Sequence, residues 1–489
     1  MSKNELALPP LRLFIDGEWR GSSDGGTFEA VNPATGTSLG NISAATADDV
    51  HAAVVSASRQ FNGGEWSRLT GADRGKLLWR LADLVQKDVA NLARLEAMDV
   101  GRPYGEAFHV EIPLVADTFR YYAGWADKIT GRTFSLPPFN GADRFSYTLR
   151  KPLGVVGAIT PWNAPTMITS WKLAPALAVG NTVVLKPAEA ASLTALRLGE
   201  LIAEAGFPPG TVNIVPGIGS VAGEALINSP GVGKVSFTGS TAVGKHIGSV
   251  AAASLKKVTL ELGGKSPQII WPDADLDIVV PAAAISIFAN QGQTCAAGSR
   301  ILVHRTIIDE FSTRLKAHAE QLVVGDPFAE DTQMGSLINQ KQLDSVLGYI
   351  AAGIAEGAEL ITGGARLKRP GYFVEPTVFI GTNSYRIAQE EIFGPVGVVI
   401  PFDNDDEALR IANESQYGLT AVLWTNDSKR INRFSNDLQA GTVWVNAWGP
   451  PHPAVPWSGT KASGIGEDLG LEGLHANTVV RTINLVSSA

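Results

Sequence analysis

Between about residues 150 and 262, short apolar segments alternate with stretches that carry apolar residues at helical spacing. The apolar segments are rich in β-branched residues and read LGVVGAIT, TVVLKP, TVNIVP, KVSFTG and KVTLEL. Strands that are apolar along their whole length and separated by helices are typical of a parallel sheet covered on both faces. We therefore predict five parallel strands joined by four crossovers, with a ligand site at the carboxyl ends of the strands.

The regions on either side of this sheet carry further patterns. Near the N-terminus, LRLFIDGEWR predicts a strand pair, and TADDVHAAVVSASRQF predicts a helix capped by Thr46. A longer helical stretch follows and ends at Gly101. After Gly264, a helix to Asn290 and then alternating strands and helices, from SRILVH to TVWVN, indicate a second α/β unit. RFSYTLRKP and ANTVVRTINLV alternate like strands, and we expect them to pair with each other or with another subunit.

The composition supports large buried cores. Of the 489 residues, 45% are hydrophobic and 18% are charged, which argues against global disorder, and the length allows roughly three domains. The net charge of −8 argues against a nucleic acid or an anionic membrane as a partner. A single cysteine cannot form an intrachain disulfide, which suits a reducing compartment. Because we find no secretory signal and no uncharged apolar run of about 18 residues, we expect a cytoplasmic protein.

That single cysteine, Cys295, lies in ANQGQTCAAGSR, between an apolar helical stretch and a predicted strand. A free cysteine is more often a small buried hydrophobe than a nucleophile. However, the surrounding glycines and alanines leave room for a substrate, and a thiol with a lowered pKa or a nearby base is a strong nucleophile. Cys295 is therefore the first candidate for covalent chemistry.

Two polar residues follow or end predicted strands. Glu261 ends the last strand, before two glycines, where a carboxylate facing a cleft can act as a general base. Asn163 lies in TPWNAP after the first strand, where its amide can donate to a developing oxyanion. A solvated strand-end acid and an ordinary turn residue explain the same positions.

Two segments could contact a nucleotide. Lys186 and Glu189 follow the second strand, and a carboxylate there can accept hydrogen bonds from ribose hydroxyls and would repel a 2′-phosphate. In FTGSTAVGK, Gly239 permits a tight turn, and Ser240 can cap a helix whose N-terminus favours an anion such as a pyrophosphate. Solvated loop charges and an ordinary helix cap are the alternatives.

Other motifs carry less weight. Gly217, Gly219 and Ala222 form a G-x-G-x-x-A pattern, but it follows the third strand and no acidic residue ends the next one. A dinucleotide fingerprint and a glycine-rich turn are therefore about equally supported. The seven histidines lack metal-ligand spacing, so we expect no metal site. GSSDG lies in a polar turn, which is weak support for a serine hydrolase.

Taken together, the segments resemble the aldehyde dehydrogenase superfamily, of the NAD(P)-dependent, non-acylating kind. The matching blocks occur in the family's order and read TPWNAPTMITSWKLAPALAVGNTVVLKPAE, FTGSTAVG, VTLELGGKSP, NQGQTC, EEIFGPV and WSGTKASGIG. The resemblance implies an α/β fold with a Rossmann-type parallel-sheet cofactor domain, a second α/β catalytic domain and a small β oligomerisation arm. It implies a dinucleotide-binding domain at 1–128 and 152–262, a catalytic domain at 263–474, and oligomerisation strands at 129–151 and 475–489.

The resemblance also implies roles for individual residues. The catalytic set comprises the nucleophile, the water-activating base, the oxyanion-hole amide and a lysine near the proton exit path, which are Cys295, Glu261, Asn163 and Lys172. The cofactor contacts are Lys186, Glu189, Gly239, Ser240, Glu391 and Phe393. The residues lining the aldehyde pocket are Met167, Trp171, Thr294, Ala296, Trp448 and Trp457.

One segment departs from the family's pattern. Where the family often has Gly-Arg-Glu, this chain has Gly466, Glu467 and Asp468. A carboxylate remains at Asp468, but the basic residue is lost, which leaves a proton-relay role there open.

The resemblance implies oxidation of an aldehyde to a carboxylic acid through a thiohemiacetal and a thioester on the cysteine. We expect NAD as the cofactor, with NADP as the alternative, and Glu189 favours NAD. The tryptophans favour an apolar or aromatic aldehyde, and we expect a homodimer or homotetramer. Two other functions stay open. A coenzyme A-acylating semialdehyde dehydrogenase would not need Glu261, and a non-catalytic nucleotide-binding protein of this fold would not need the catalytic set.

Overall fold

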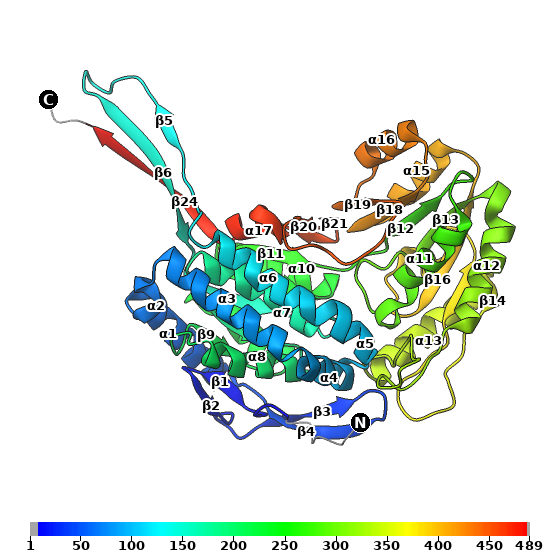
Figure 1. The fold of residues 1–489 in the computed structure, drawn as a ribbon, viewed down its shortest axis with the longest axis horizontal. Coiled ribbons are helices and arrows are strands. Elements are labelled where there is room, and N and C mark those ends of the chain that lie inside the picture. The colour runs from blue at the N-terminus through cyan, green and yellow to red at the C-terminus, as the bar shows by residue number, and fades with distance from the viewer. Residues whose placement is uncertain (1–7, 487–489) are drawn as a thin grey trace.

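The computed structural model describes residues 8–486, and most of the strands lie in two sheets (Figure 1). The larger sheet has eight strands in the order β2-β1-β9-β8-β7-β10-β11-β22. Its five central strands run parallel, as predicted, and are β7 (Val155–Ile159), β8 (Thr182–Lys186), β9 (Val212–Ile214), β10 (Val232–Thr238) and β11 (Lys257–Glu261). The antiparallel edge strands are β1 (Leu13–Ile15), β2 (Glu18–Arg20) and β22 (Gly464–Ile465).

Helices cover this sheet because its central strands are apolar on both faces. Every residue of β7 and of β8 is buried. The crossover helices are α7 (Pro165–Ala178), α8 (Leu193–Glu204), α9 (Glu224–Asn228) and α10 (Thr241–Ala253). The N-terminal helices are α1 (Ala47–Asn62), α2 (Glu65–Arg68), α3 (Gly71–Lys87), α4 (Val89–Val100), α5 (Tyr104–Glu106) and α6 (Ile112–Trp125). Between α5 and α6 lies a π-helical turn, Ala107–Glu111.

The N-terminal helices confirm the predicted cap and modify one boundary. The Thr46 side chain accepts from the Asp49 amide while the Asp49 carboxylate accepts from the Thr46 amide, which forms a capping box before α1. The long helical stretch that ends at Gly101 is two helices, because the chain turns at Asp88. The Asp88 carboxylate binds Arg197 of α8 at 2.7 Å, which fixes this turn against the neighbouring helix.

The second sheet has seven strands in the order β14-β15-β16-β13-β12-β18-β19. They are β14 (Glu359–Thr362), β15 (Thr377–Ile380), β16 (Val396–Phe402), β13 (Arg300–His304), β12 (Pro267–Ile270), β18 (Thr420–Trp424) and β19 (Thr442–Val445). Its helices are α11 (Leu276–Phe288), α12 (Ile308–Gln321), α13 (Gln340–Ala355), α14 (Arg386–Gln389), α15 (Asp405–Asn413) and α16 (Ser428–Asp437). The second α/β unit is thereby confirmed.

One predicted boundary in this unit is wrong. The helix expected to reach Asn290 ends at Phe288, and a tight turn follows. Asn290 and Gln291 have φ angles of 49° and 58°, in the left-handed region that no α-helix continues through.

A three-stranded arm projects from the body of the molecule (Figure 1). Strands β6 (Arg144–Pro152) and β24 (Thr478–Val486) pair antiparallel along their length, and β5 (Thr133–Ser135) pairs with β6. This confirms that RFSYTLRKP and ANTVVRTINLV pair with each other. The predicted domain boundaries and the oligomerisation role of the arm stay predictions, and residues 1–7 and 487–489 of those ranges lie outside the described residues.

The remaining elements are short. They are the strand pairs β3 (Thr27–Asn32) with β4 (Thr37–Ser43), β17 (Tyr417–Gly418) with β21 (Thr460–Lys461), and β20 (Trp457–Ser458) with β23 (Glu467–Asp468), and the helix α17 (Gly470–His475). Among residues 8–486, no helix has the length and apolar character needed to cross a membrane.

Candidate active site

The segment after β11 touches the turn that carries Cys295. Gly264 lies so close that a side chain there would come within 2.3 Å of the Cys295 carbonyl oxygen. Cys295 itself is partly exposed and packs against the large apolar core around α7. Glu261, the last residue of β11, and the candidate nucleophile therefore lie in one site, although 34 positions separate them in the sequence.

The electrostatic surroundings of Cys295 keep its thiol protonated. Burial raises its pKa to about 12, and the negative charges of Glu391 and Glu261 act in the same direction. The backbone N–H groups of Ala296 and Cys295 oppose this shift because they stabilise the thiolate. The sulfur therefore becomes a thiolate only when a base takes its proton or a positive charge comes near.

Asn163 faces the same turn from the sheet. It follows β7 and precedes α7, and its Nδ2 donates to the carbonyl oxygen of Gln293 at 2.9 Å. Since one amide hydrogen makes this bond, the second hydrogen of Nδ2 is available to another acceptor. The structure thus brings Asn163 to the segment that carries Cys295, as an oxyanion-hole role requires.

Glu261 lies in an unusual environment for a carboxylate. It is 3% exposed, and neither of its oxygens hydrogen-bonds to any residue among 8–486. Burial raises its pKa well above the usual value, the nearby carboxylate of Asp468 adds to this, and Lys172 opposes it. A carboxylate with a raised pKa is a stronger base than an ordinary carboxylate, and it is suited to accept and release a proton.

Lys172 and Asp468 form a buried ion pair next to Glu261. Lys172 Nζ, on α7, donates to Asp468 Oδ2, on β23, and both side chains are almost fully buried. The carboxylate that replaces the family's usual residue is therefore held by the lysine from the predicted catalytic set. Glu467, which stands where a basic residue is usual, is exposed.

The predicted cofactor contacts at the strand ends lie close together. Lys186 ends β8, is 3% exposed, and its Nζ lies 3.0 Å from a Glu189 carboxylate oxygen. Ser240 caps α10 by accepting from the Val243 amide at 3.4 Å. Gly239 donates to the Glu261 carbonyl at 3.0 Å, which links the ends of β10 and β11. These groups line the carboxyl edge of the sheet, where a nucleotide is expected to bind.

Glu391 and Phe393 approach from the second unit. Glu391 Oε1 accepts from the Gly264 amide at 3.0 Å, and burial raises the pKa of this carboxyl to about 7. Phe393 has a φ of 55°, and its ring meets Trp162 edge to face, with centroids 5.2 Å apart. A side chain at Gly292 would lie 2.1 Å from the Gly394 carbonyl oxygen, so the Phe393 loop packs on the Cys295 turn.

Three of the six predicted pocket residues are tryptophans, and Trp171, Ala296 and Trp457 are buried. The rings of Trp171 and Trp457 lie 6.0 Å apart, and Trp448 Nε1 donates to the Ala296 carbonyl at 3.4 Å. Thr294 and Met167 are partly buried. Trp448 thereby reaches the residue beside Cys295, while Met167 lies one turn from Trp171 on α7.

Comparison with known proteins identifies the family. The sequence profile of the aldehyde dehydrogenase family matches residues 19–483. Human retinal dehydrogenase 2 is 48% identical over 483 residues, which are 98% of this chain and 92% of that protein. Rat mitochondrial aldehyde dehydrogenase is 48% identical over 478 residues, or 97% of this chain and 91% of that protein.

A solved structure agrees as well. The NAD+ complex of aldehyde dehydrogenase from Bacillus cereus has a TM-score of 0.96 at 44% identity, covering 98% of this chain and 96% of that one. The chain belongs to the aldehyde dehydrogenase family. It is an NAD(P)-dependent aldehyde dehydrogenase, and the predicted fold class is confirmed.

The segment with the G-x-G-x-x-A pattern lies beside the predicted cofactor contacts of this aldehyde dehydrogenase. Gly219 begins a π-helical turn, Gly219–Gly223, and its N–H faces the Glu189 carboxylate. The segment is a turn next to Glu189, and it does not stand at the first strand of the sheet as a dinucleotide fingerprint would.

Sequence reasoning missed several residues around the site. Arg102, Asn290, Gln293 and Trp162 all contact predicted site residues or the turn that holds them. The signal that could have identified Asn290 is its place directly before Gln-Gly, because asparagine is one of the few residues that readily adopts a left-handed turn.

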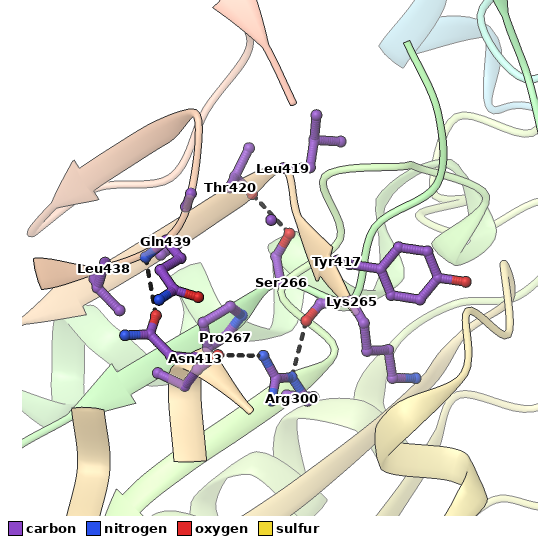
Figure 2. Close-up of a pocket in the computed structure, with 14 residues that line it drawn as sticks. Lys265, Ser266, Pro267, Arg300, Asn413, Tyr417, Leu419, Thr420, Leu438 and Gln439 are labelled. Atoms are coloured by element: carbon purple, nitrogen blue, oxygen red, sulfur yellow. Dashed lines mark hydrogen bonds between the residues drawn. The ribbon is translucent and has the colours of Figure 1, made fainter. Parts of the chain in front are cut away.

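A small cavity beside the start of β12 has too little space for a substrate (Figure 2). Its volume of about 10 Å³ is the space of a single water molecule. Thr420 Oγ1 donates to Ser266 Oγ at 2.8 Å, and Arg300 Nε donates to the Lys265 carbonyl at 2.9 Å. These bonds fix the start of β12 under the Ala296 backbone, whose carbonyl lies 3.4 Å from Thr420 Oγ1.

Proposed function

We propose that this aldehyde dehydrogenase uses NAD to oxidise an apolar or aromatic aldehyde to the carboxylic acid, through a thioester on Cys295. The observation that carries the proposal is that Cys295, the Asn163 amide and the Glu261 carboxylate meet at the carboxyl edge of one sheet, where Glu261 accepts no hydrogen bond from residues 8–486. A nucleophile, an oxyanion donor and a base in this arrangement are what acyl-transfer chemistry requires.

The donor set at the sheet edge fits NAD. Lys186 and Glu189 offer an ammonium and a carboxylate to the hydroxyls of an adenosine ribose, and Ser240 stands at the N-terminus of α10, where a pyrophosphate is favoured. Glu391 and Phe393 lie next to the Cys295 turn and would hold the nicotinamide ribose and ring. When bound, NAD supplies the hydride acceptor for the reaction.

Formation of the thioester depends on Cys295 and Asn163. A base takes the proton of the Cys295 thiol, the sulfur bonds to the aldehyde carbon, and the electron pair of the C=O bond moves to the oxygen, which becomes an oxyanion. When the C=O bond forms again, the carbon–hydrogen bond breaks, the hydride would pass to NAD, and the thioester remains. The free hydrogen of Asn163 Nδ2 and the backbone N–H of Cys295 donate to that oxyanion. Removing one such donor typically lowers the rate by about 10²–10³-fold.

Release of the acid depends on Glu261. Its carboxylate takes a proton from a water molecule, the water oxygen bonds to the acyl carbon, and the carbon–sulfur bond breaks. The buried pair of Lys172 and Asp468 sets the charge around Glu261 and offers a route by which its proton returns to solvent.

The substrate and partners follow from the surroundings. Trp171, Trp448 and Trp457 present apolar rings near Cys295, which suits an apolar or aromatic aldehyde, and one relative is named a retinal dehydrogenase. Glu189 would repel a 2′-phosphate, which favours NAD over NADP. The exposed apolar side chains of the arm, among them Phe145, Val480 and Leu485, suit a homodimer or homotetramer.

An aldehyde panel tests the proposal. NADH formation should be fastest with apolar or aromatic aldehydes, slower with NADP, and independent of coenzyme A. Cys295→Ser should abolish oxidation while leaving NAD binding intact, because the side chain is replaced by a poorer nucleophile of similar size. Acyl-coenzyme A as the product, or full turnover by the Cys295→Ser variant, would overturn the proposed mechanism.

A further inference from the structure

A closed set of buried hydrogen bonds joins Asn163 to the turn that carries Cys295. We propose that Arg102 and Asn290, here called the Arg102–Asn290 bracket, are positioning residues that aim the Asn163 amide at the oxyanion. The inference rests on the proposed function of Asn163 and adds to it what holds that side chain in place.

The bracket meets Asn163 at its backbone carbonyl. Arg102 Nη2 donates to this oxygen at 2.9 Å, and Asn290 Nδ2 donates to it at 2.8 Å. Arg102 Nε also donates to Asn290 Oδ1 at 3.2 Å, so the two side chains orient each other. Because both donors converge on one oxygen, the Asn163 backbone has little freedom to rotate.

The same bracket reaches the Cys295 turn. Asn290 Nδ2 lies 3.2 Å from the Gln293 carbonyl oxygen, and Asn163 Nδ2 donates to that oxygen at 2.9 Å. This bond uses one hydrogen of the Asn163 side-chain amide. Because the amide group is planar, the direction of its second hydrogen is fixed as well. The backbone of Asn163 and the turn two residues before Cys295 are held at one distance from each other.

The other side of the guanidinium is anchored by acids. Arg102 is 3% exposed and pairs with Glu111, with Glu96 at 3.3 Å and with Glu106 at 3.7 Å. Glu96 in turn accepts from Thr166 Oγ1 at 2.5 Å, in the first turn of α7, just after Asn163. The bracket thus holds both the Asn163 carbonyl and the start of the helix that follows.

The residue types suit this task better than a purely structural one. A planar guanidinium can serve several acceptors in fixed directions at once, which an ammonium cannot. A buried charge cluster is seldom the most stabilising way to fill a core, and apolar residues of similar volume often do as well. Asn290 and Gln291 also hold left-handed backbone conformations, a strain that tends to persist where function needs it.

The expected effect follows from the precision that an oxyanion site needs. A displacement of about 1 Å can cost roughly 10²-fold in rate. Loss of the bracket should therefore slow formation of the tetrahedral adduct, and it should leave intact any reaction of Cys295 that develops no oxyanion.

Asn290→Gly is the principal test variant, because glycine keeps the left-handed backbone and removes the side-chain bonds. Two reagents are compared without NAD or aldehyde. With p-nitrophenyl acetate, the Cys295 sulfur bonds to the acetyl carbon through an oxyanion and nitrophenolate leaves. With iodoacetamide, the sulfur displaces iodide and no oxyanion forms. We expect the acetyl-transfer rate to fall about 10- to 100-fold and the alkylation rate to stay within about twofold.

Three further variants keep the test decisive. Arg102→Lys retains the buried charge but not the planar guanidinium, so it should lose most of the acetyl-transfer rate, as Arg102→Met does, while alkylation stays nearly unchanged. Gln291→Gly adds the same backbone freedom one residue on, at a side chain that does not bond to Asn163, and should keep the wild-type ratio of the two rates.

The outcomes separate this inference from the proposed function. A wild-type acetyl-transfer rate in Asn290→Gly, or an equal loss of both rates, would overturn the bracket. If the wild type transfers acetyl groups but oxidises no aldehyde, the proposed function fails while the bracket is still tested by the ratio of the two rates.

Discussion

The two polar groups that flank Cys295 are held in opposite ways. Asn163 is bound at its carbonyl by two donors and at its amide by a third contact, whereas the Glu261 carboxylate makes no hydrogen bond to any residue of the described chain. Both are buried, at 8% and 3% exposure. The contrast matches their proposed tasks. An oxyanion donor is most effective when it need not reorganise, whereas a base must exchange a proton with a water molecule and needs free oxygens.

The largest effect is expected when the Glu261 carboxylate is removed. Glu261→Gln should lower steady-state turnover by roughly 10³-fold, because the acyl group stays on Cys295 without a base to activate water. The first turnover should survive, so rapid mixing with NAD and aldehyde should show a burst of about one NADH per active site. An unaltered steady-state rate would show that another group activates the water.

Removal of the Asn163 amide should instead affect the first turnover. Asn163→Ala should lower turnover by about 10²–10³-fold through loss of one oxyanion donor. Here the NADH burst itself should slow or vanish, because the step before hydride loss becomes rate-limiting. Active-site titration with iodoacetamide provides the control, since it counts intact Cys295 independently of the oxyanion. A full-speed burst in this variant would remove Asn163 from the adduct step.

A smaller effect concerns the charges behind Glu261. The Asp468 carboxylate raises the pKa of Glu261 and Lys172 lowers it. Asp468→Asn removes the first influence and leaves Lys172 unbalanced, so the pKa should fall. The acidic limb of the kcat profile should therefore move to lower pH.

Glu467→Gln is the matched control for this shift. Glu467 is exposed, and among Asp468, Lys172 and Glu467 it has the weakest influence on the pKa of Glu261. The pH dependence of kcat in Glu467→Gln should therefore hardly differ from that of the wild type. Rates are compared per titrated active site, because an unpaired buried Lys172 can cost several kcal/mol of stability, on the order of 3–5. A limb that stays in place would mean that Glu261 does not set it.

The secondary structure was predictable from the sequence where its pattern is local. The five parallel strands were recognisable because each is apolar along its whole length, and the arm strands because they alternate. Strand β12 (PQII) was missed because no helix separates it from β11, although all of its residues are buried between β13 and β18. The local pattern therefore predicted strands that stand apart between helices.

The site was predictable only in part. The segments with Cys295, Glu261 and Asn163 stood out by motif, but their supports did not. Arg102 reads as a charge after a helix and Glu96 as a polar position within one, yet both are buried. Lys172 and Asp468 are 296 positions apart, and no local pattern reports such a pair. The charges that balance a buried site come from distant parts of the chain, so only the folded structure brings them together.

The smallest expected effect is on the melting temperature. It tests whether the Glu261 carboxylate lacks hydrogen-bond partners, as it does among residues 8–486. Since the folded protein raises the pKa of this carboxyl, the folded state binds the proton more tightly than the unfolded state. Its favourable contribution is therefore present at low pH, below the unfolded pKa, and is lost as pH rises through the folded pKa. Above that pH the wild type carries a buried charge that Lys172 compensates only in part and that Glu261→Gln lacks. As pH rises from 4.5 to 8, the melting temperature of the variant relative to the wild type should increase by about 1–2 °C. A decrease over this range would mean that the carboxylate is stabilised by partners in solution, and the contrast between the two flanks of Cys295 would not hold.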